Sequence, residues 1–379
     1  MADIRYKELA GLLVNYSMKV QPGENALIEV FGQEEALTKE LIKAVYAAGG
    51  RPFVMVQNDR FRKLWLEQAD EQAVRLLAER DRAFMRQMDC YCGLRLAENK
   101  YDMAELSDEA NERFVQFYAA PVHMQTRVPH TKWVVLRYPN AAMAQEAHMS
   151  TDAFADYYFR VCNFDYPAFS KAMDPLHQLL CRGERVQIRG RDVELSFSIK
   201  GMGAVKCDGE KNIPDGEVYT APVKDSVEGY ITYNTPSPEN GKTYERVHLR
   251  FERGRIVECS CAGGEELQKS LAGIFDTDEG ARYIGEFAFG LHPIITEPMG
   301  DTLFDEKISG SFHFTPGNSY DDCDNGNKSA VHWDMVYIMR PEYGGCEIWL
   351  DGELIQKDGV FVPDSLQGLN AGALKKLCF

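Results

Sequence analysis

The hydrophobic pattern of the chain changes near residue 183, and this change most constrains the fold. Before it, apolar residues at helical spacing (6–20 and 33–48) alternate with short apolar runs (26–31 and 51–56). A run of alternating helices and strands predicts parallel strands with helices covering the sheet. Further on, residues 132–137 are typical of a strand, and residues 141–148 and 152–180 are typical of helices.

Beyond residue 183 the apolar residues recur at every second position. Residues 186–190, 193–199 and 247–251 have this alternation, which is the period of a half-buried strand, and one helix is expected at 264–274. We therefore predict two domains. Residues 1–182 form an α/β domain with a mostly parallel sheet, and residues 183–379 form a mixed α+β, strand-rich catalytic domain.

Composition excludes several classes of protein. The formal net charge is −16, so a phosphate backbone would be repelled and nucleic acid is not an expected partner. The chain starts with a polar segment, and no apolar run reaches the ~18 residues that a membrane helix requires. The 10 cysteines form no CxxC motif. Reduced thiols, a cytoplasmic location and no membrane contact are the expectations.

Side chains that bind divalent metals or move protons gather in the second half of the chain. His332 and Asp334 are two residues apart in an apolar run that reads as a strand, so both would face the same way and could meet at one ion. For an isolated His-x-Asp, however, a surface pair on a sheet is the commoner explanation.

Other candidates are weak when taken singly. Glu286 enters an apolar stretch, where a charge costs free energy unless it is paired or bound to a cation. His313 lies between phenylalanines, where a hydrogen-bonded core histidine is usual. Glu306 could be a solvated loop charge, Glu217 an exposed residue at a strand edge and Tyr320 a loop tyrosine.

Together these residues indicate a metal-dependent hydrolase. Three glutamates, an aspartate and two histidines contain too many carboxylates for a structural zinc site, which prefers cysteine. The set suits two divalent ions that share a water molecule. The chain has no GxGxxG loop after its first strand, no P-loop, no HExxH motif and no GxSxG nucleophile elbow.

The motifs that carry these residues resemble the thermophilic aminopeptidase family, which contains aminopeptidase T, aminopeptidase II and the PepS-type enzymes. The resemblance covers the whole chain. It comprises residues 9–24, 212–222, 226–229, Gly280-Ala281-Arg282 with Gly285-Glu286, Asp305-Glu306, His313 with Gly317 and Tyr320, and His332-Trp333-Asp334. Two spacings differ from the usual pattern: 313–332 is shorter and 306–313 is longer.

The resemblance implies a homodimeric metalloaminopeptidase that acts on peptides with a free N-terminus. It assigns the ligands of two divalent ions (zinc, cobalt, manganese or magnesium) to Glu217, Glu286, His313, His332 and Asp334, with Glu306 as a further acidic position. A two-metal-activated water would attack the peptide carbonyl, with Glu286 or Glu306 moving the proton and Tyr320 stabilising the tetrahedral intermediate. The N-terminal domain would then shape substrate access and dimer contacts.

Two alternatives to an aminopeptidase remain. One is a catalytically inactive member of the same scaffold that binds peptide or metal. The other is a metal-dependent amide or ester hydrolase of different specificity. Only an aminopeptidase requires the free α-amine of its substrate.

Overall fold

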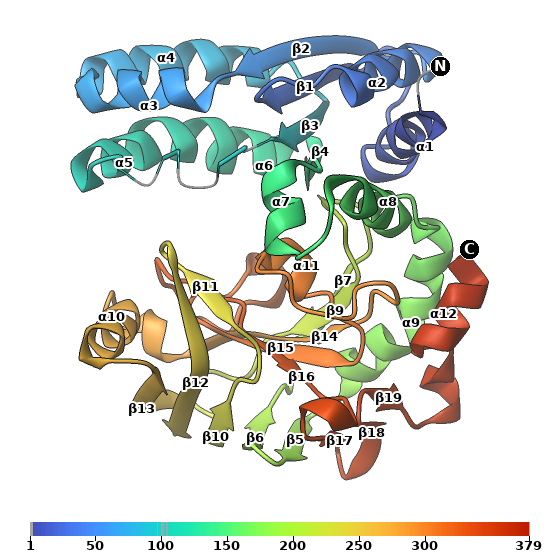
Figure 1. Cartoon of the computed structure of the whole chain (residues 1–379), viewed down its shortest axis with the longest axis vertical. Helices are drawn as coiled ribbons and strands as arrows, with labels where there is room; N and C mark the ends of the chain where they lie inside the picture. The colour runs from blue at the N-terminus through green and yellow to red at the C-terminus, as the bar shows by residue number, and fades with distance from the viewer. Residues whose placement is uncertain (1–2, 97, 100–101, 104, 379) are drawn as a thin grey trace. The chain divides into compact units, whose positions relative to one another are not determined.

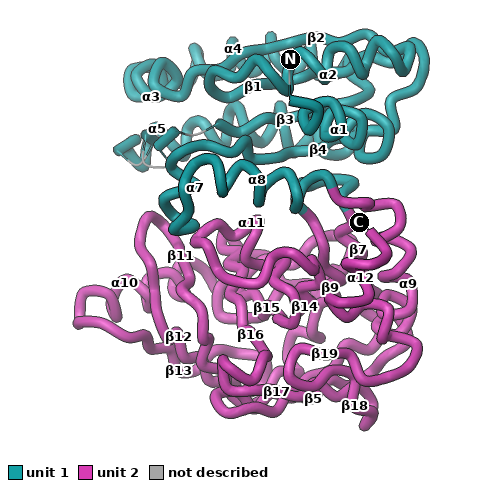
Figure 2. The backbone as a smooth tube through the Cα atoms, turned by 45° about the vertical axis from the view of Figure 1, so that its right-hand side comes forward, with its two compact units in different colours: residues 1–163, 209–214 teal, residues 164–208, 215–379 magenta. Residues whose placement is uncertain are grey.

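The chain divides into two compact units (Figure 2). The computed structural model describes residues 3–96, 98–99, 102–103 and 105–378. Unit 1 comprises Met1–Asn163 and Gly209–Pro214, and unit 2 comprises Phe164–Asp208 and Asp215–Phe379. The division falls at residue 163, whereas the sequence suggested 182.

Unit 1 is built on a five-stranded sheet in the order β2-β1-β3-β4-β8, and every strand pair in it is parallel. The four longer strands are separated in sequence by helices, as the alternating pattern predicted. The strands are β1 Asn25–Phe31, β2 Arg51–Gln57, β3 Cys90–Arg95, β4 Lys132–Arg137 and the short β8 Asn212–Ile213.

Polar caps start most helices of unit 1. Asn58, Asp70, Ser107 and Ser150 each accept a hydrogen bond from a backbone N–H in the first turn of the helix that follows. The helices are α1 Ile4–Leu12, α2 Ala36–Ala47, α3 Asp59–Gln68, α4 Glu71–Met85, α5 Asp108–Phe114, α6 Val128–His130, α7 Ala141–Glu146 and α8 Thr151–Cys162, with π-helical turns at Leu13–Ser17 and Val115–Arg127.

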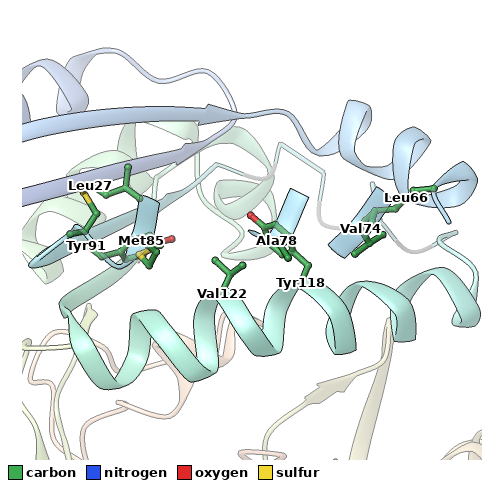
Figure 3. Close-up of a cluster of buried hydrophobic side chains, with 10 residues drawn as sticks. Leu27, Leu66, Val74, Ala78, Met85, Tyr91, Tyr118 and Val122 are labelled. Carbon is green, nitrogen blue, oxygen red and sulfur yellow. The ribbon is translucent and has the colours of Figure 1, made fainter. Parts of the chain in front are cut away.

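A buried apolar cluster joins the sheet of unit 1 to its helices (Figure 3). Tyr118 and Val122, on the helix at Val115–Arg127, point toward Ala78 and Met85 of α4. Tyr91 of β3 belongs to the same cluster, and its hydroxyl donates a 2.7 Å hydrogen bond to the buried Glu29. This hydrogen bond compensates part of the free energy that burial of Glu29, the one charged residue of β1, costs.

Unit 2 contains two sheets with antiparallel pairing (Figure 1). The larger has nine strands in the order β11-β12-β10-β6-β5-β17-β18-β19, with β13 paired to β12. Its strands are β5 Arg185–Gly190, β6 Val193–Ser198, β10 Glu228–Thr232, β11 Ser237–Glu239, β12 Lys242–Glu252, β13 Arg255–Ala262, β17 Cys346–Leu350, β18 Glu353–Lys357 and β19 Val360–Phe361.

The smaller sheet of unit 2 has five strands in the order β16-β15-β14-β9-β7. Its strands are β7 Val205–Cys207, β9 Glu217–Thr220, β14 Ile284–Gly290, β15 Ser311–Pro316 and β16 Val336–Ile338. Every residue of β9, β14 and β15 is buried. The helices of the unit are α9 Tyr166–Arg182, α10 Glu265–Phe275, α11 Thr302–Asp305 and α12 Ala371–Cys378.

Phenylalanines join the two sheets of unit 2. Phe197 of β6 packs against Phe287 of β14 and Phe314 of β15, with ring centroids 5.2 Å apart in both pairs. Phe251 of β12 lies 5.8 Å from Phe314 on the same side. Side chains alternate along a strand, so the phenylalanines occupy one face of β14 and β15. The residues between them project from the opposite face.

Helix α9 explains why the division comes earlier in the chain than the sequence suggested. The helical pattern of residues 152–180 is broken into α8 and α9, and α9 makes its contacts within unit 2. The Tyr166 hydroxyl accepts a hydrogen bond from the backbone N–H of Asp215, and Asp174 pairs with Lys206 at 2.7 Å. These partners are remote in sequence, so local periodicity could not reveal them.

All ten cysteines are free thiols. In the part of the chain that the structure describes, no helix combines the length and apolar character needed to cross a membrane.

Candidate metal centre

One face of the five-stranded sheet of unit 2 carries acidic and imidazole side chains. Glu217 begins β9, Glu286 lies in β14 and His313 lies in β15, and all three are buried. Phe287 pairs with Phe314 and Ala288 pairs with His313 across the two central strands. Alternation therefore places the phenylalanines on the core face and the polar residues on the other face.

Glu286 is the centre of this group. Its Oε1 lies 2.9 Å from Nε2 of His313, and its Oε2 lies 3.9 Å from Nε2 of His332. Nε2 of His313 is also 3.5 Å from Oε2 of Glu217. Ligand atoms of Glu217, Glu286 and His313 all lie within 4.8 Å of one another, close enough to share one ion.

His332 and Asp334 join the group from an extended segment that precedes β16, not from the strand that the sequence predicted. Nε2 of His332 lies 3.3 Å from Oδ1 of Asp334, so the two side chains do face the same way. The segment lies outside the named strands, but an isolated bridge between Gly317 and His332, together with backbone hydrogen bonds such as that from the N–H of Trp333 to the carbonyl oxygen of Pro316, ties it to the end of β15. Trp333, between them, is buried against Tyr244 and Phe275.

A backbone carbonyl fixes the orientation of the His332 ring. Nδ1 of His332 lies 2.8 Å from the carbonyl oxygen of Asn318, which can only accept a hydrogen bond. Nδ1 is therefore the protonated nitrogen, and Nε2 presents its lone pair toward Glu286 and Asp334 when the ring is neutral. Metal-binding histidines are commonly held in this way.

Glu306 is buried at the end of α11 and is not the solvated loop charge that was the simpler explanation. Its Oε1 is 2.5 Å from Nζ of Lys307, a residue that the sequence patterns did not single out. Lys307 is 1% exposed and also contacts Glu217 at 2.8 Å and Asp215 at 3.6 Å. The available signal was a lysine between an acidic residue and an apolar one, which is too common to be informative.

The neighbouring Asp305 has a structural role. Its two carboxylate oxygens accept hydrogen bonds from the backbone N–H groups of Met299 and Gly300. Thr315, also absent from the sequence-based set, donates a 2.8 Å hydrogen bond to Oδ1 of Asp334 and so helps to hold that carboxylate.

Tyr320 lies beside the group. Its ring centroid is 4.5 Å from that of His332, and the side chain remains partly accessible, with 47% of the residue exposed. Burial of part of the side chain, with the carboxylates of Asp334 and Glu286, raises the pKa of the Tyr320 hydroxyl. The hydroxyl thus stays protonated and can donate a hydrogen bond.

The pKa values of the group reflect crowded negative charge. Burial raises the pKa of Glu286, and it raises that of Glu306 well above its usual range. Burial alone would lower the pKa of His313, but the carboxylates of Glu217 and Glu286 outweigh it and raise the pKa to about 9. Burial would also lower the pKa of His332, but nearby carboxylates, chiefly that of Asp334, outweigh it and raise the pKa to about 10.

These residues fit a divalent metal. Oε2 of Glu217 is a buried acceptor with no hydrogen-bond partner among the described residues, although it faces the other donors of the group. Carboxylates mixed with imidazoles suit zinc, cobalt and manganese. A cation placed among them would satisfy Oε2. It would also neutralise the negative charge of the carboxylates, which protonated histidines balance in the metal-free protein.

The chain belongs to the thermophilic metalloprotease (M29) family, whose family model matches residues 2–361. The membership confirms the resemblance that the sequence motifs indicated. It also establishes a metal-dependent peptidase as the class of protein that this fold and this group of residues define.

Comparison with individual proteins agrees with the family. The chain is 24% identical to aminopeptidase PepS of Streptococcus thermophilus, over 94% of this chain and 95% of that protein. Its fold is similar to that of wild-type AmpT from Thermus thermophilus, with a TM-score of 0.78 at 20% identity, covering 95% of this chain and 99% of that one.

A second solved structure shows that the fold alone does not specify the reaction. The chain is similar, with a TM-score of 0.60 and 12% identity, to 2,5-dihydroxypyridine dioxygenase from Pseudomonas putida KT2440, covering 95% of this chain and 98% of that one. The function must therefore be argued from the side chains.

The first prediction concerns the close contact at Gly317. This residue has φ of +107°, and a Cβ there would lie 2.0 Å from the carbonyl oxygen of Val331, so Gly317→Ala must displace the segment that carries His332. We expect zinc affinity, measured by competition with a chromogenic chelator, to fall about 10- to 100-fold. Gly326→Ala is the control, because Gly326 has φ of +78° and open space around it. Equal affinities in the two variants would contradict this interpretation.

The second prediction concerns protons. At pH 7.5 both His313 and His332 are positively charged imidazolium groups in the metal-free protein, since their pKa values of about 9 and about 10 lie above that pH. Metal ligation requires neutral imidazole, so zinc binding should release protons and weaken as the pH falls. Calorimetry in two buffers of different ionisation enthalpy measures the number released. His332→Gln should reduce it by about one, whereas His248→Gln should not, and the absence of proton release would contradict the assignment.

Proposed function

We propose that the protein is a metal-dependent aminopeptidase that releases N-terminal residues from peptides with a free α-amine. The observation that carries the proposal is the convergence of Glu217, Glu286, His313, His332 and Asp334 on one face of a sheet. Membership of a metalloprotease family and similarity to a protein named as an aminopeptidase support the reaction class.

We further propose that the group holds two divalent ions. The two oxygens of Glu286 face different histidines, which suits a carboxylate shared between two ions, one on the His313 and Glu217 side and one on the His332 and Asp334 side. Charge balance supports the same number. Two divalent ions and the ammonium of Lys307 would neutralise the five carboxylates of Asp215, Glu217, Glu286, Glu306 and Asp334.

Divalent ions, when bound, lower the pKa of water and polarise a carbonyl group. The chain itself supplies the proton transfers. Both oxygens of Glu286 are engaged with histidines, whereas Glu306 keeps only Oε1 on Lys307. We therefore assign the movement of the proton from water to the leaving amine to Glu306, and the metal-bridging role to Glu286.

Tyr320 would stabilise the oxyanion of the tetrahedral intermediate. Its hydroxyl stays protonated because its pKa is raised, and its ring is tied to the metal centre by contact with His332. A donor aimed at developing negative charge in a partly buried site lowers the barrier of the reaction. The α-amine of the substrate would be held by a carboxylate of the site or by one of the ions.

The residues assigned to the metal centre all belong to unit 2, and we propose that unit 1 shapes access to peptides and supplies dimer contacts. Free thiols at all ten cysteines fit a reducing compartment, and we propose the cytoplasm. Light scattering coupled to size exclusion would give the number of subunits.

The test of function uses aminoacyl-p-nitroanilides and the chelator-stripped protein. Cleavage should return only when zinc, cobalt or manganese is added, and acetylation of the α-amine should abolish it. Cleavage of the acetylated substrates would indicate a hydrolase of other specificity. Stoichiometric metal binding without any cleavage would indicate a binding protein.

Glu306→Gln tests the proton transfer. Turnover should fall about 10²- to 10⁴-fold, while the metal content stays that of the unmodified protein. Glu266→Gln, at an exposed position of α10, is the control and should change neither quantity. Loss of an ion from Glu306→Gln would instead make Glu306 a metal ligand.

A further inference from the structure

Lys307 is a permanent cation enclosed by the carboxylates of the metal centre. Its side chain is 1% exposed, and its Nζ lies 2.5 Å from Glu306, 2.8 Å from Glu217 and 3.6 Å from Asp215. Removing an ammonium group from water is costly unless several anions surround it. The position of Nζ is consequently fixed by the neighbouring Glu306 and by the two carboxylates of the 215–217 segment.

The contact with Lys307 gives the two carboxylate oxygens of Glu217 different surroundings. Oε1 faces Nζ of Lys307, whereas Oε2 faces Nε2 of His313 at 3.5 Å and has no hydrogen-bond partner among the described residues. A carboxylate held by one oxygen cannot rotate freely about its last bond. Lys307 thus leaves Oε2, and not Oε1, directed at the histidines.

A second group of possible ligands also includes Glu217. Atoms of Cys207, Asp215 and Glu217 lie within 4.8 Å of one another. Cys207 pairs directly with Glu217 across β7 and β9. A thiolate with two carboxylates would ordinarily be attractive to zinc or cobalt. Nζ of Lys307, however, already lies against both carboxylates of this group.

We propose that Lys307 is a positioning residue that takes the place of a metal ion between Asp215, Glu217 and Glu306. It closes the Cys207 side of Glu217 to metal and confines the bound ions to the side of His313 and His332. The proposal rests on the metal centre described above, but it makes a separate claim, namely which of two adjacent ligand groups is used and why.

The experiment uses the full-length protein, stripped with chelator and reloaded with Co²⁺. Cobalt bound to a thiolate has a charge-transfer absorption in the near ultraviolet that cobalt bound to oxygen and nitrogen lacks. The unmodified protein should bind cobalt without this band, and Cys207→Ser should leave its metal content and affinity unchanged.

Lys307→Met removes the charge and keeps an unbranched side chain. This variant should gain the thiolate band and about one additional ion per chain, and Cys207→Ser in the same chain should abolish both gains. Its metal-free form should melt at least about 5 °C lower than the unmodified protein, because buried carboxylates lose their counter-ion. Lys206→Met is the matched control, since Lys206 pairs with Asp174 and its side chain lies on the opposite face of β7 from Cys207.

Every outcome of these experiments either supports or overturns the proposal. A thiolate band in the unmodified protein, or loss of an ion from Cys207→Ser alone, would overturn the proposal without the use of a Lys307 variant. A folded Lys307→Met protein with an unchanged ion count and no band would also overturn it. If the unmodified protein bound no metal, the metal centre itself would fail and this inference with it.

Discussion

The burial of carboxylates against one face of a five-stranded sheet is the interaction on which unit 2 depends. Glu217 and Glu286 point from strands whose every residue is buried, and Glu306 and Asp215 are buried beside them. Such charges destabilise a fold unless cations accompany them. Lys307 is one such cation, and protonated His313 and His332 can serve in the metal-free protein. Under the proposed function, divalent ions complete the neutralisation.

The apolar side of the same sheet makes this arrangement tolerable. Phe287 and Phe314 alternate with the polar residues and pack against Phe197 of the larger sheet, so both faces of β14 and β15 are occupied. The strands that carry Glu286 and His313 are therefore held by core packing, independently of metal. A centre built in this way can be preorganised, because its ligands need not fold around the ion.

The sequence revealed the fold class and the family because both are recorded in local patterns. The period of two in residues 193–199 and the helix–strand alternation before residue 57 correspond to β6 and to the parallel sheet. The pairing of α9 with unit 2 was missed, since it depends on contacts such as Tyr166 with Asp215 that no local pattern contains. His332 and Asp334 were rightly expected to face the same way, although their segment is extended and not part of a strand.

The candidate site, too, was predicted only where local sequence patterns mark its residues. Glu286 stood out as a charge within an apolar run, which is a local signal. Lys307, in contrast, resembles any surface lysine next to a glutamate, and only its three-dimensional contacts with Glu217 and Asp215 reveal its burial. Motifs therefore indicated the residues that we propose as metal ligands, whereas the buried Lys307, which we propose separates the two ligand groups, was found only in the structure.

The most direct test of the central claim is an anomalous-scattering map from crystals loaded with zinc and measured at the zinc absorption edge. We predict two peaks in each chain, both in contact with Glu286, one beside His313 and the other beside His332 and Asp334. A map with no peak at Glu286, or with zinc bound only elsewhere in the molecule, would contradict the proposed centre.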